Sequence, residues 1–167
     1  RNLNGIEVEK LFDSINALRS TPSLGAFRFR CTNKWLGGGH NRTVVKNAYG
    51  LSQEQPARQE PFVLEADEPA ILLGTDKAAN PVEHLLHALT ACVTSSIVYH
   101  AAAKGVKIHE IQSRTEGDID LRGFLGIDDK VPRGYQNIRM KFKIKADVPP
   151  EKLKEIVDLG PTYSPVF

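Results

Sequence analysis

The sequence predicts an α+β protein, because one long helical pattern separates two regions with strand patterns. The helical pattern covers residues 81–104, the strand patterns lie before residue 46 and between residues 106 and 146, and another helix is expected after residue 149. The chain has 167 residues, 41% hydrophobic and 25% charged, which is enough for one sizeable core at average soluble composition. We expect an N-terminal helical extension over residues 1–25 and a single domain over residues 26–167.

The first residues have the pattern of an amphipathic helix. Hydrophobic residues recur at helical spacing, and Pro22 and Gly25 end the run. We expect this helix to pack on the outside of the body of the protein. The hydrophobic positions are Val8, Leu11, Phe12, Ile15 and Leu18.

Two strands are expected around a glycine turn. Residues 27–33 alternate as in a half-buried strand, and Gly37-Gly38-Gly39 then turns the chain into a second strand around residues 43–45. Residues 50–60 and 128–134 are rich in polar residues, Gly and Pro, so we expect both to be exposed loops.

The central helix has well-marked ends. Asn80 is a favourable N-cap, Pro81 suits the first helical position, and Gly105 follows the last helical residue, Lys104. At about 100° per residue, the side chains nearest to Cys92 are mostly apolar or small, so we expect Cys92 to face inward. One interpretation of an inward-facing cysteine is that it is simply a small hydrophobic residue of the core. The neighbours are Leu85, Ala88, Leu89, Ser96 and Tyr99.

Strands are also expected over residues 106–121 and 137–146. The second of these alternates strictly: Ile138, Met140, Phe142 and Ile144 share one face, and Arg139, Lys141, Lys143 and Lys145 share the other. A solvated strand face accounts for the basic stripe, since no aromatic ladder for base stacking accompanies it. Pro149-Pro150-Glu151 then opens the last helix.

Composition and charge argue against several classes of protein. A net charge of +2 is too small to indicate nucleic-acid binding, and two cysteines cannot form a disulfide scaffold. The longest apolar stretches are interrupted by charge or are shorter than the ~18 residues that span a bilayer, and no leader pattern opens the chain. Glu83, His84 and His87 share a helix face, but a further ligand in register is missing, so we assign no metal. We expect a cytoplasmic protein without a membrane partner.

The segment Asn80–Cys92, Asn-Pro-x-Glu-x-Leu-Leu-x-Ala-Leu-x-Ala-Cys, resembles the signature of the OsmC/Ohr family. The similarity extends over about residues 27–167. It includes the glycine turn and Tyr163-Ser164-Pro165-Val166, which is similar to the family's Cys-Pro-Val segment with serine in place of cysteine. The resemblance implies antiparallel sheets wrapped around two central helices, an interlocked homodimer in which both subunits build each active site, and a last strand after Phe167.

Members of this family are thiol-dependent peroxidases that reduce organic hydroperoxides in oxidative or osmotic stress, and their reactive cysteine corresponds to Cys92. The family's thiolate is stabilised by an arginine of the glycine turn, which a glutamate ten residues before the cysteine orients. Here His40 stands at the arginine position with Arg42 two residues later, and Glu83 stands one residue after the glutamate position. Cys92, Glu83, Arg42 and His40 are therefore the candidate catalytic residues, and His84 and His87 are alternative cations or proton donors.

Ser164 cannot act as the family's second, resolving cysteine. An external thiol reductant could resolve oxidised Cys92, Cys31 could substitute, or peroxidase activity could be lost; no other cofactor is expected. The apolar pocket would be lined by Leu85, Leu89 and Tyr99 and would favour alkyl hydroperoxides. The alternative is an OsmC-like protein without turnover that binds a small apolar or electrophilic ligand. A cysteine hydrolase using His84 or His87 is disfavoured, because these residues lie about 7–12 Å from Cys92 along the helix axis.

Overall fold

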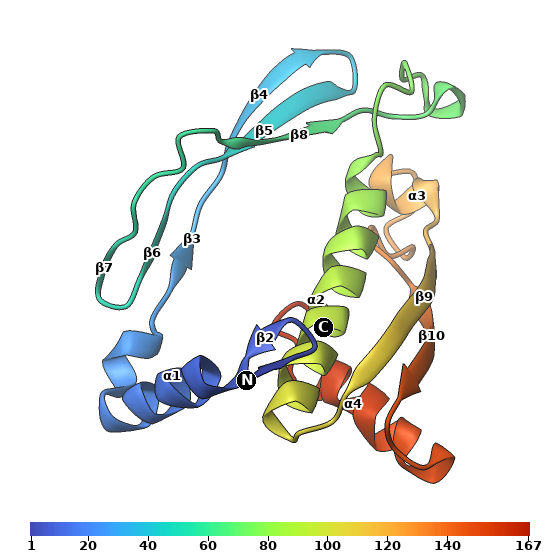
Figure 1. Ribbon diagram of the computed structural model, residues 1–167. Coiled ribbons are helices and arrows are strands. Elements are labelled where there is room, and N and C mark those ends of the chain that lie inside the picture. Colours follow the sequence, from blue (N-terminus) through green and yellow to red (C-terminus); the bar gives the residue numbers. More distant parts are fainter. The chain divides into compact units, whose positions relative to one another are not determined.

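The computed structural model describes residues 1–167, which form two compact units (Figure 1). We call Glu9–His84 the sheet unit, and Arg1–Val8 together with Leu85–Phe167 the helix unit. The expected boundary between an extension and a domain at residues 25 and 26 stays a prediction.

The sheet unit holds two small antiparallel sheets. One has the strand order β3-β6-β7, with β3 at Arg28–Phe29, β6 at Ala48–Gly50 and β7 at Gln53–Glu54. The other has the order β4-β5-β8, with β4 at Thr32–Gly37, β5 at His40–Val45 and β8 at Phe62–Ala66. The predicted N-terminal helix is present as α1, Val8–Ser20, and a 3-10 turn at Pro22–Gly25 follows it.

The expected continuous strand over residues 27–33 is wrong. The structure breaks it into β3 and β4, because Arg28 pairs with Tyr49 in one sheet whereas Thr32 pairs with Val44 in the other. Its apolar residues are also not half-buried in the single chain, since Phe29 is 79% exposed. Local alternation indicated an extended segment, but it could not show that the segment changes partners.

The glycine turn forms as expected. Gly37 and Gly38 have φ angles of +115° and +57°, a left-handed conformation that glycine adopts without a steric cost. The register of the hairpin shifts between Trp35 and Gly37, so the turn carries a bulge, and His40 begins the returning strand. The turn therefore fixes where the polar side chains of β5 lie on the sheet.

The helix unit is built on one long helix and a two-stranded sheet. Helix α2, Pro81–Ala103, lies alongside the antiparallel strands β9, Ile108–Asp118, and β10, Asn137–Ala146 (Figure 1). A 3-10 turn at Pro150–Lys152 leads into α4, Leu153–Tyr163. Short elements complete the unit: β1 at Asn2–Leu3, β2 at Ile6–Glu7 and α3 at Leu121–Phe124.

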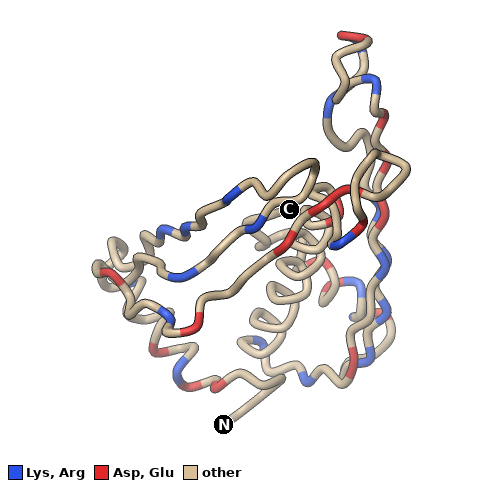
Figure 2. Tube along the Cα trace, turned by 90° about the horizontal axis from the view of Figure 1, so that it is seen from above, with Lys and Arg blue, Asp and Glu red and all other residues tan.

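The core of the helix unit lies between α2, α4 and one face of the sheet. Leu89, Val93, Ile97, Ala101 and Ile156 are buried together. The alternating apolar residues of β10 pack against them, as the pattern predicted; these are Ile138, Met140, Phe142 and Ile144. On the opposite, solvated face, β9 and β10 are linked by ion pairs such as Arg139 with Glu116. Figure 2 shows where basic and acidic residues recur along the chain.

The first strand of this sheet is shorter than expected. Residues 106–121 were expected to be extended, but β9 ends at Asp118 and α3 begins at Leu121. The cause is local: the carboxylate of Asp120 accepts a hydrogen bond from the backbone N–H of Arg122 and so caps a helical turn. The guanidinium and backbone N–H of Arg122 lower the pKa of Asp120 to about 2.

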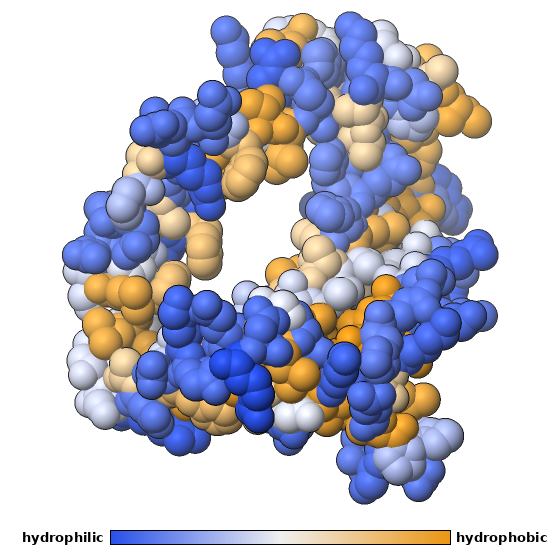
Figure 3. Space-filling view, in the orientation of Figure 1, coloured by the Kyte–Doolittle hydropathy of each residue, from blue (hydrophilic) through white to orange (hydrophobic).

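By length and composition alone, α2 could cross a membrane, which the sequence analysis did not expect. The helix has 23 residues and its only Asp, Glu, Lys or Arg is Glu83. Core helices of soluble proteins pass the same test, so one such helix is weak support for a membrane span. Large hydrophobic side chains also reach the surface in several places on the chain (Figure 3).

Candidate functional site

The start of α2 is fixed by a reciprocal capping box. The side-chain oxygen of Asn80 accepts from the backbone N–H of Glu83 at 2.9 Å, and the carboxylate of Glu83 accepts from the backbone N–H of Asn80 at 3.0 Å. Two N–H groups that have no partner within the helix are thereby satisfied. The predicted N-cap is confirmed, and one oxygen of Glu83 is engaged at the helix end.

Cys92 lies at the margin of the buried face of α2. The buried stripe is centred on Leu89, Val93 and Ile97, and Cys92 is displaced from Val93 by about 100° of helix rotation. Its thiol is therefore half-buried and forms no disulfide. The expectation that Cys92 faces inward among enclosed neighbours needs correction, because Leu85 is 51% and Tyr99 49% exposed in the single chain.

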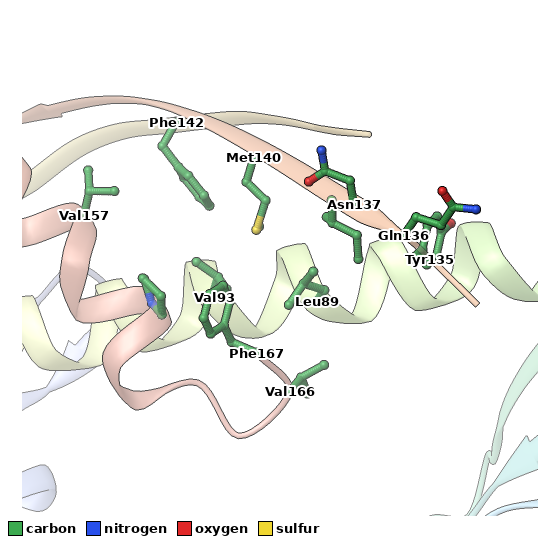
Figure 4. Close-up of a pocket in the computed structure, with 12 residues that line it drawn as sticks. Leu89, Val93, Tyr135, Gln136, Asn137, Met140, Phe142, Val157, Val166 and Phe167 are labelled. Atoms are coloured by element: carbon green, nitrogen blue, oxygen red, sulfur yellow. The ribbon is translucent and has the colours of Figure 1, made fainter. Parts of the chain in front are cut away.

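An apolar pocket of about 620 Å³ opens between α2, β10, α4 and the C-terminal residues (Figure 4). Met140 and Phe142 point into it from β10, and Leu89 and Val93 approach from α2 (Figure 4). Of the three residues expected to line a pocket, Leu89 lines this one, whereas Leu85 and Tyr99 are not among its lining residues. The other lining residues are Tyr135, Gln136, Asn137, Ile138, Val157, Pro161, Val166 and Phe167.

In the sheet unit, one carboxylate joins the two candidate cations. Arg42 on β5 lies directly opposite Glu65 on β8, so their side chains share one face of the sheet. The Nε of Arg42 donates to one carboxylate oxygen of Glu65, and the Nε2 of His40 donates to the other at 2.6 Å. These two donors hold the pKa of Glu65 below its usual value, with Arg42 the larger cause.

The charge on this sheet face is positive. Lys34 on β4 lies directly opposite Arg42 on its other side, so Arg42 stands between a lysine and Glu65. No hydrogen bond joins the two terminal nitrogens of Arg42 to another residue of this chain, and its side chain is 47% exposed. The arrangement leaves a guanidinium held at Nε with its Nη donors available to an anion.

Glu65 was missed by the sequence analysis. Its contact with Arg42 depends on the register of β5 against β8, which joins residues 23 positions apart. The available signal was weak: a single charged residue follows Val63 and Leu64 in a short apolar strand. A carboxylate in a short apolar strand is expected to pair with an opposite charge, and a neighbouring strand that carries basic residues can supply it.

The two histidines of the first turns of α2 have different surroundings. His84 donates from Nε2 to the backbone carbonyl of Glu65 at 2.8 Å, which requires the proton on Nε2. This bond ties the beginning of α2 to β8 inside the sheet unit. His87 is exposed.

The loop before α2 is organised by a second carboxylate that the sequence analysis did not single out. Asp67 is only 1% exposed and accepts hydrogen bonds from the hydroxyl of Thr75 at 2.5 Å and from the backbone N–H groups of Glu68 and Lys77. These donors hold the pKa of Asp67 far below its usual value, with the Thr75 hydroxyl the largest cause. Asp67 thus closes the loop that leads to Asn80.

Ser164 follows α4 and acts as a turn residue. Its hydroxyl accepts from the backbone N–H groups of Val166 and Phe167 at 3.2 and 3.1 Å. The neighbouring Tyr163 stacks on His100 of α2 with ring centroids 3.9 Å apart, and burial together with Lys104 lowers the pKa of His100. The segment that resembles the family's second cysteine site is therefore docked on α2 through an aromatic contact.

The structure thus gathers the candidates into separate groups. His40 and Arg42 meet at Glu65 in the sheet unit, where Glu83 caps α2, while Cys92 and Ser164 belong to the helix unit. Cys31 is exposed between β3 and β4 and forms no disulfide. No group of three or more His, Cys, Asp or Glu side chains is arranged to hold a metal ion.

The fold and the site define a class of α+β protein. Its features are an unpaired cysteine on a long central helix and a glycine-turn hairpin that precedes this helix in the sequence. The family model described as OsmC-like protein matches residues 74–167, more than half of the chain. The protein therefore belongs to the OsmC-like family, and the resemblance stated from the sequence is confirmed. Comparison with curated proteins gave no match.

Solved structures share the fold. An OsmC-like protein from Mycoplasma pneumoniae is 18% identical with a TM-score of 0.62, covering 83% of this chain and 84% of its own. An osmotic stress induced and detoxification response protein from Psychrobacter arcticus is 13% identical, with a TM-score of 0.60 and coverage of 81% and 83%. An organic hydroperoxide resistance protein OsmC from Legionella pneumophila is 14% identical, with a TM-score of 0.55 and coverage of 83% and 86%. The expected α+β fold with antiparallel sheets and packed helices is confirmed.

Proposed function

We propose that this protein is a thiol-dependent peroxidase that reduces organic hydroperoxides at Cys92 and serves in defence against oxidative or osmotic stress. The observation that carries the proposal is an unpaired, half-buried thiol on the central helix of an OsmC-like fold. The Legionella relative is itself described as an organic hydroperoxide resistance protein. The family and the thiol together favour peroxide chemistry over other uses of a cysteine.

The proposed first step is attack by the Cys92 thiolate on the outer oxygen of the hydroperoxide. A sulfur–oxygen bond forms while the oxygen–oxygen bond breaks, and the leaving alkoxide takes up a proton to become the alcohol. Cys92 is then a sulfenic acid. The hydroperoxide has been reduced by two electrons that the sulfur supplied.

We assign the second step to an external thiol, because Ser164 cannot form a disulfide. One thiol attacks the sulfenic sulfur, forming a mixed disulfide with Cys92 and releasing water. A second thiol opens that disulfide, so Cys92 is restored and the external pair leaves oxidised. Cys31, which is exposed, remains the alternative resolving thiol.

A cation must favour the thiolate, since burial among apolar groups raises the pKa of a thiol. We assign this role to Arg42, with His40 as the second candidate. The support is chemical: the terminal nitrogens of Arg42 form no hydrogen bond within the chain, and the sheet face that carries Arg42 also carries Lys34. Guanidinium donors of this kind bind anions well.

We further propose that two copies of the chain form the working unit. Leu85 and Tyr99 on α2, and Trp35 and Phe62 in the β4-β5-β8 sheet, are each about half exposed or more. Large apolar side chains that gather at a surface mark interaction sites in soluble proteins. A homodimer would cover them.

The test is stopped-flow consumption of cumene hydroperoxide by reduced protein, with dithiothreitol or a lipoylated protein as reductant. We expect repeated turnover that Cys92→Ser abolishes and Cys31→Ser leaves intact. Reaction of Cys92 once only, or activity that survives Cys92→Ser, would contradict the proposal. Loss of turnover in Cys31→Ser alone would instead identify Cys31 as the resolving residue.

A second function is favoured by the apolar pocket: binding of a small apolar or electrophilic ligand without turnover. Its volume of about 620 Å³ lies in the range of small-molecule sites, and most of its lining is aliphatic or aromatic. The test is titration with an apolar fluorescent probe, 1-anilinonaphthalene-8-sulfonate, with Met140→Glu as the variant that places a charge in the pocket. Saturable binding that this variant abolishes, in a protein without peroxide turnover, would favour the binding function.

A further inference from the structure

We propose that Glu65 is the residue that positions Arg42 for its role at the thiol, in place of a carboxylate on α2. This inference rests on the proposed peroxidase, in which Arg42 serves Cys92. Glu65 would act through Arg42 and touch neither the thiol nor the hydroperoxide. It is therefore a positioning residue.

The first observation is that the carboxylate of α2 is engaged elsewhere. One oxygen of Glu83 accepts from the backbone N–H of Asn80, and the side chain of Asn80 accepts in return from Glu83. No hydrogen bond or ion pair joins Glu83 to Arg42 or to His40. Helix capping thus explains the presence of a carboxylate at Glu83, and no contact with a cation is needed.

The second observation is the geometry around Glu65. Each of its two oxygens accepts from a different side chain of β5, one from the Nε of Arg42 and the other from the Nε2 of His40 at 2.6 Å. Its backbone carbonyl accepts from His84 at 2.8 Å, so β8 is also tied to the start of α2 at this residue. Glu65 is held at both side chain and backbone.

The third observation concerns which nitrogens of Arg42 are used. The contact to Glu65 runs through Nε, so both Nη groups keep their donors for another acceptor. A bidentate contact through the Nη groups, such as the one that Arg30 makes with Glu54, would leave the guanidinium occupied. Glu65 therefore orients Arg42 without consuming its outer face.

Electrostatics provides a discriminating test. Glu65 adds a negative charge to a sheet face that otherwise carries Lys34, Arg42 and His40. If Glu65 acted only through its charge, its removal would strengthen the positive field and make the thiolate easier to form. If Glu65 positions Arg42, its removal releases the guanidinium and makes the thiolate harder to form. The two effects have opposite signs.

The experiment compares Glu65→Ala, Glu65→Gln and Glu65→Asp with Glu54→Gln, which removes a carboxylate from another arginine pair of the same unit. Two quantities are measured: kcat/KM for cumene hydroperoxide, and the pH midpoint for alkylation of Cys92 by iodoacetamide in a Cys31→Ser background. Circular dichroism and thermal unfolding of every variant check that it is folded. The alkylation needs no peroxide, so it reports on Arg42 and Cys92 even if turnover is absent.

We expect Glu65→Ala to lower kcat/KM by about tenfold or more and to move the alkylation midpoint upward by about one pH unit, the size of effect that an adjacent charge has on a thiol. Glu65→Gln keeps one acceptor and should lie between Glu65→Ala and the wild type, and Glu65→Asp, which keeps the charge, should recover part of the loss. Glu54→Gln should match the wild type.

Glu83→Gln is measured in the same way, because it removes the carboxylate of α2. A midpoint that stays in place or moves downward in folded Glu65→Ala would overturn the proposal, and so would a larger upward shift in Glu83→Gln than in Glu65→Gln. Absence of peroxide turnover in the wild type would instead contradict the proposed function. The two failures are therefore distinguishable.

Discussion

Three carboxylates close to one another in the sequence have different partners and therefore different roles. Glu83 accepts from a backbone N–H at a helix start, Asp67 accepts from four donors of its own loop, and Glu65 accepts from the side chains of an arginine and a histidine. Only the last of these arrangements leaves a cation oriented and available. Residue type alone does not distinguish them, whereas the identity of the donors does.

The capping box predicts a specific loss of stability. Asn80→Ala should lower the free energy of unfolding by about 1 kcal/mol, because the backbone N–H of Glu83 loses its acceptor. Asn80→Gly should cost only a few tenths of a kcal/mol, since glycine leaves that N–H open to water. Urea unfolding followed by circular dichroism measures both. Equal stability of the alanine variant and the wild type would mean that the cap contributes nothing.

Asp67 predicts a pH dependence of stability. Its donors lower its pKa in the folded protein, so the stability it adds is fully present above the unfolded value of about 3.9 and is lost as the pH falls from there through the folded pKa. The difference in melting temperature between wild type and Asp67→Asn should therefore be largest above pH 5 and shrink below pH 4. Thermal unfolding across this pH range is the measurement. A difference that grows in acid would contradict the assignment.

At the scale of elements, α4 packs on α2 through a close backbone approach. A Cβ at Gly160 would lie 2.5 Å from a methyl carbon of Val93 and 3.0 Å from the Val93 carbonyl oxygen. The α4 backbone therefore comes nearer to α2 than any larger residue would allow. The same helix carries the stack of Tyr163 on His100.

Gly160→Ala should lower the free energy of unfolding by about 1–3 kcal/mol, because the helices must separate to admit the methyl group. This cost exceeds the gain of about 0.5–1 kcal/mol that alanine has over glycine inside a helix. Gly134→Ala is the matched control, since nothing lies within 4 Å of a Cβ at that position. Urea unfolding of the two variants and the wild type measures these changes in the free energy of unfolding. A Gly160→Ala variant more stable than the wild type would contradict the close packing of α4 on α2.

Elements marked by local signals were predictable from the sequence. The cap at Asn80 and strict alternation along β10 gave correct bounds, because both depend on residues close together in the chain. The break between β3 and β4 and the role of Glu65 were not predictable, since both depend on strand pairing across many residues. The partial exposure of Cys92 was missed because the rotation of α2 is set by packing of Val93 and its neighbours on the distant β10 strand.

At the scale of the whole molecule, exposed apolar side chains lead us to expect self-association. Leu85 and Tyr99 share the side of α2 that carries Cys92, and both are about half exposed. A helix that is apolar beyond its buried stripe is typical of one enclosed by further partners. The proposed homodimer would supply them.

Light scattering with size exclusion should show a dimer for the wild type. The double variant Leu85→Glu and Tyr99→Glu should be monomeric or dissociate at a concentration at least about tenfold higher, because two charges would have to be buried. Lys130→Glu, a change of charge in an exposed loop, is the control. A monomeric wild type would contradict the proposed assembly.

The capping box also affects how related chains are found. A pattern search that demands a carboxylate ten places before the cysteine passes over this sequence, which has Val82 there and the capping Glu83 one place later. A search that accepts Asn-Pro-x-Glu at the helix start and adds an acidic residue on the preceding strand, as at Glu65, would retrieve it. Proteins recovered in this way would share the helix start and the strand carboxylate as a recognisable subgroup.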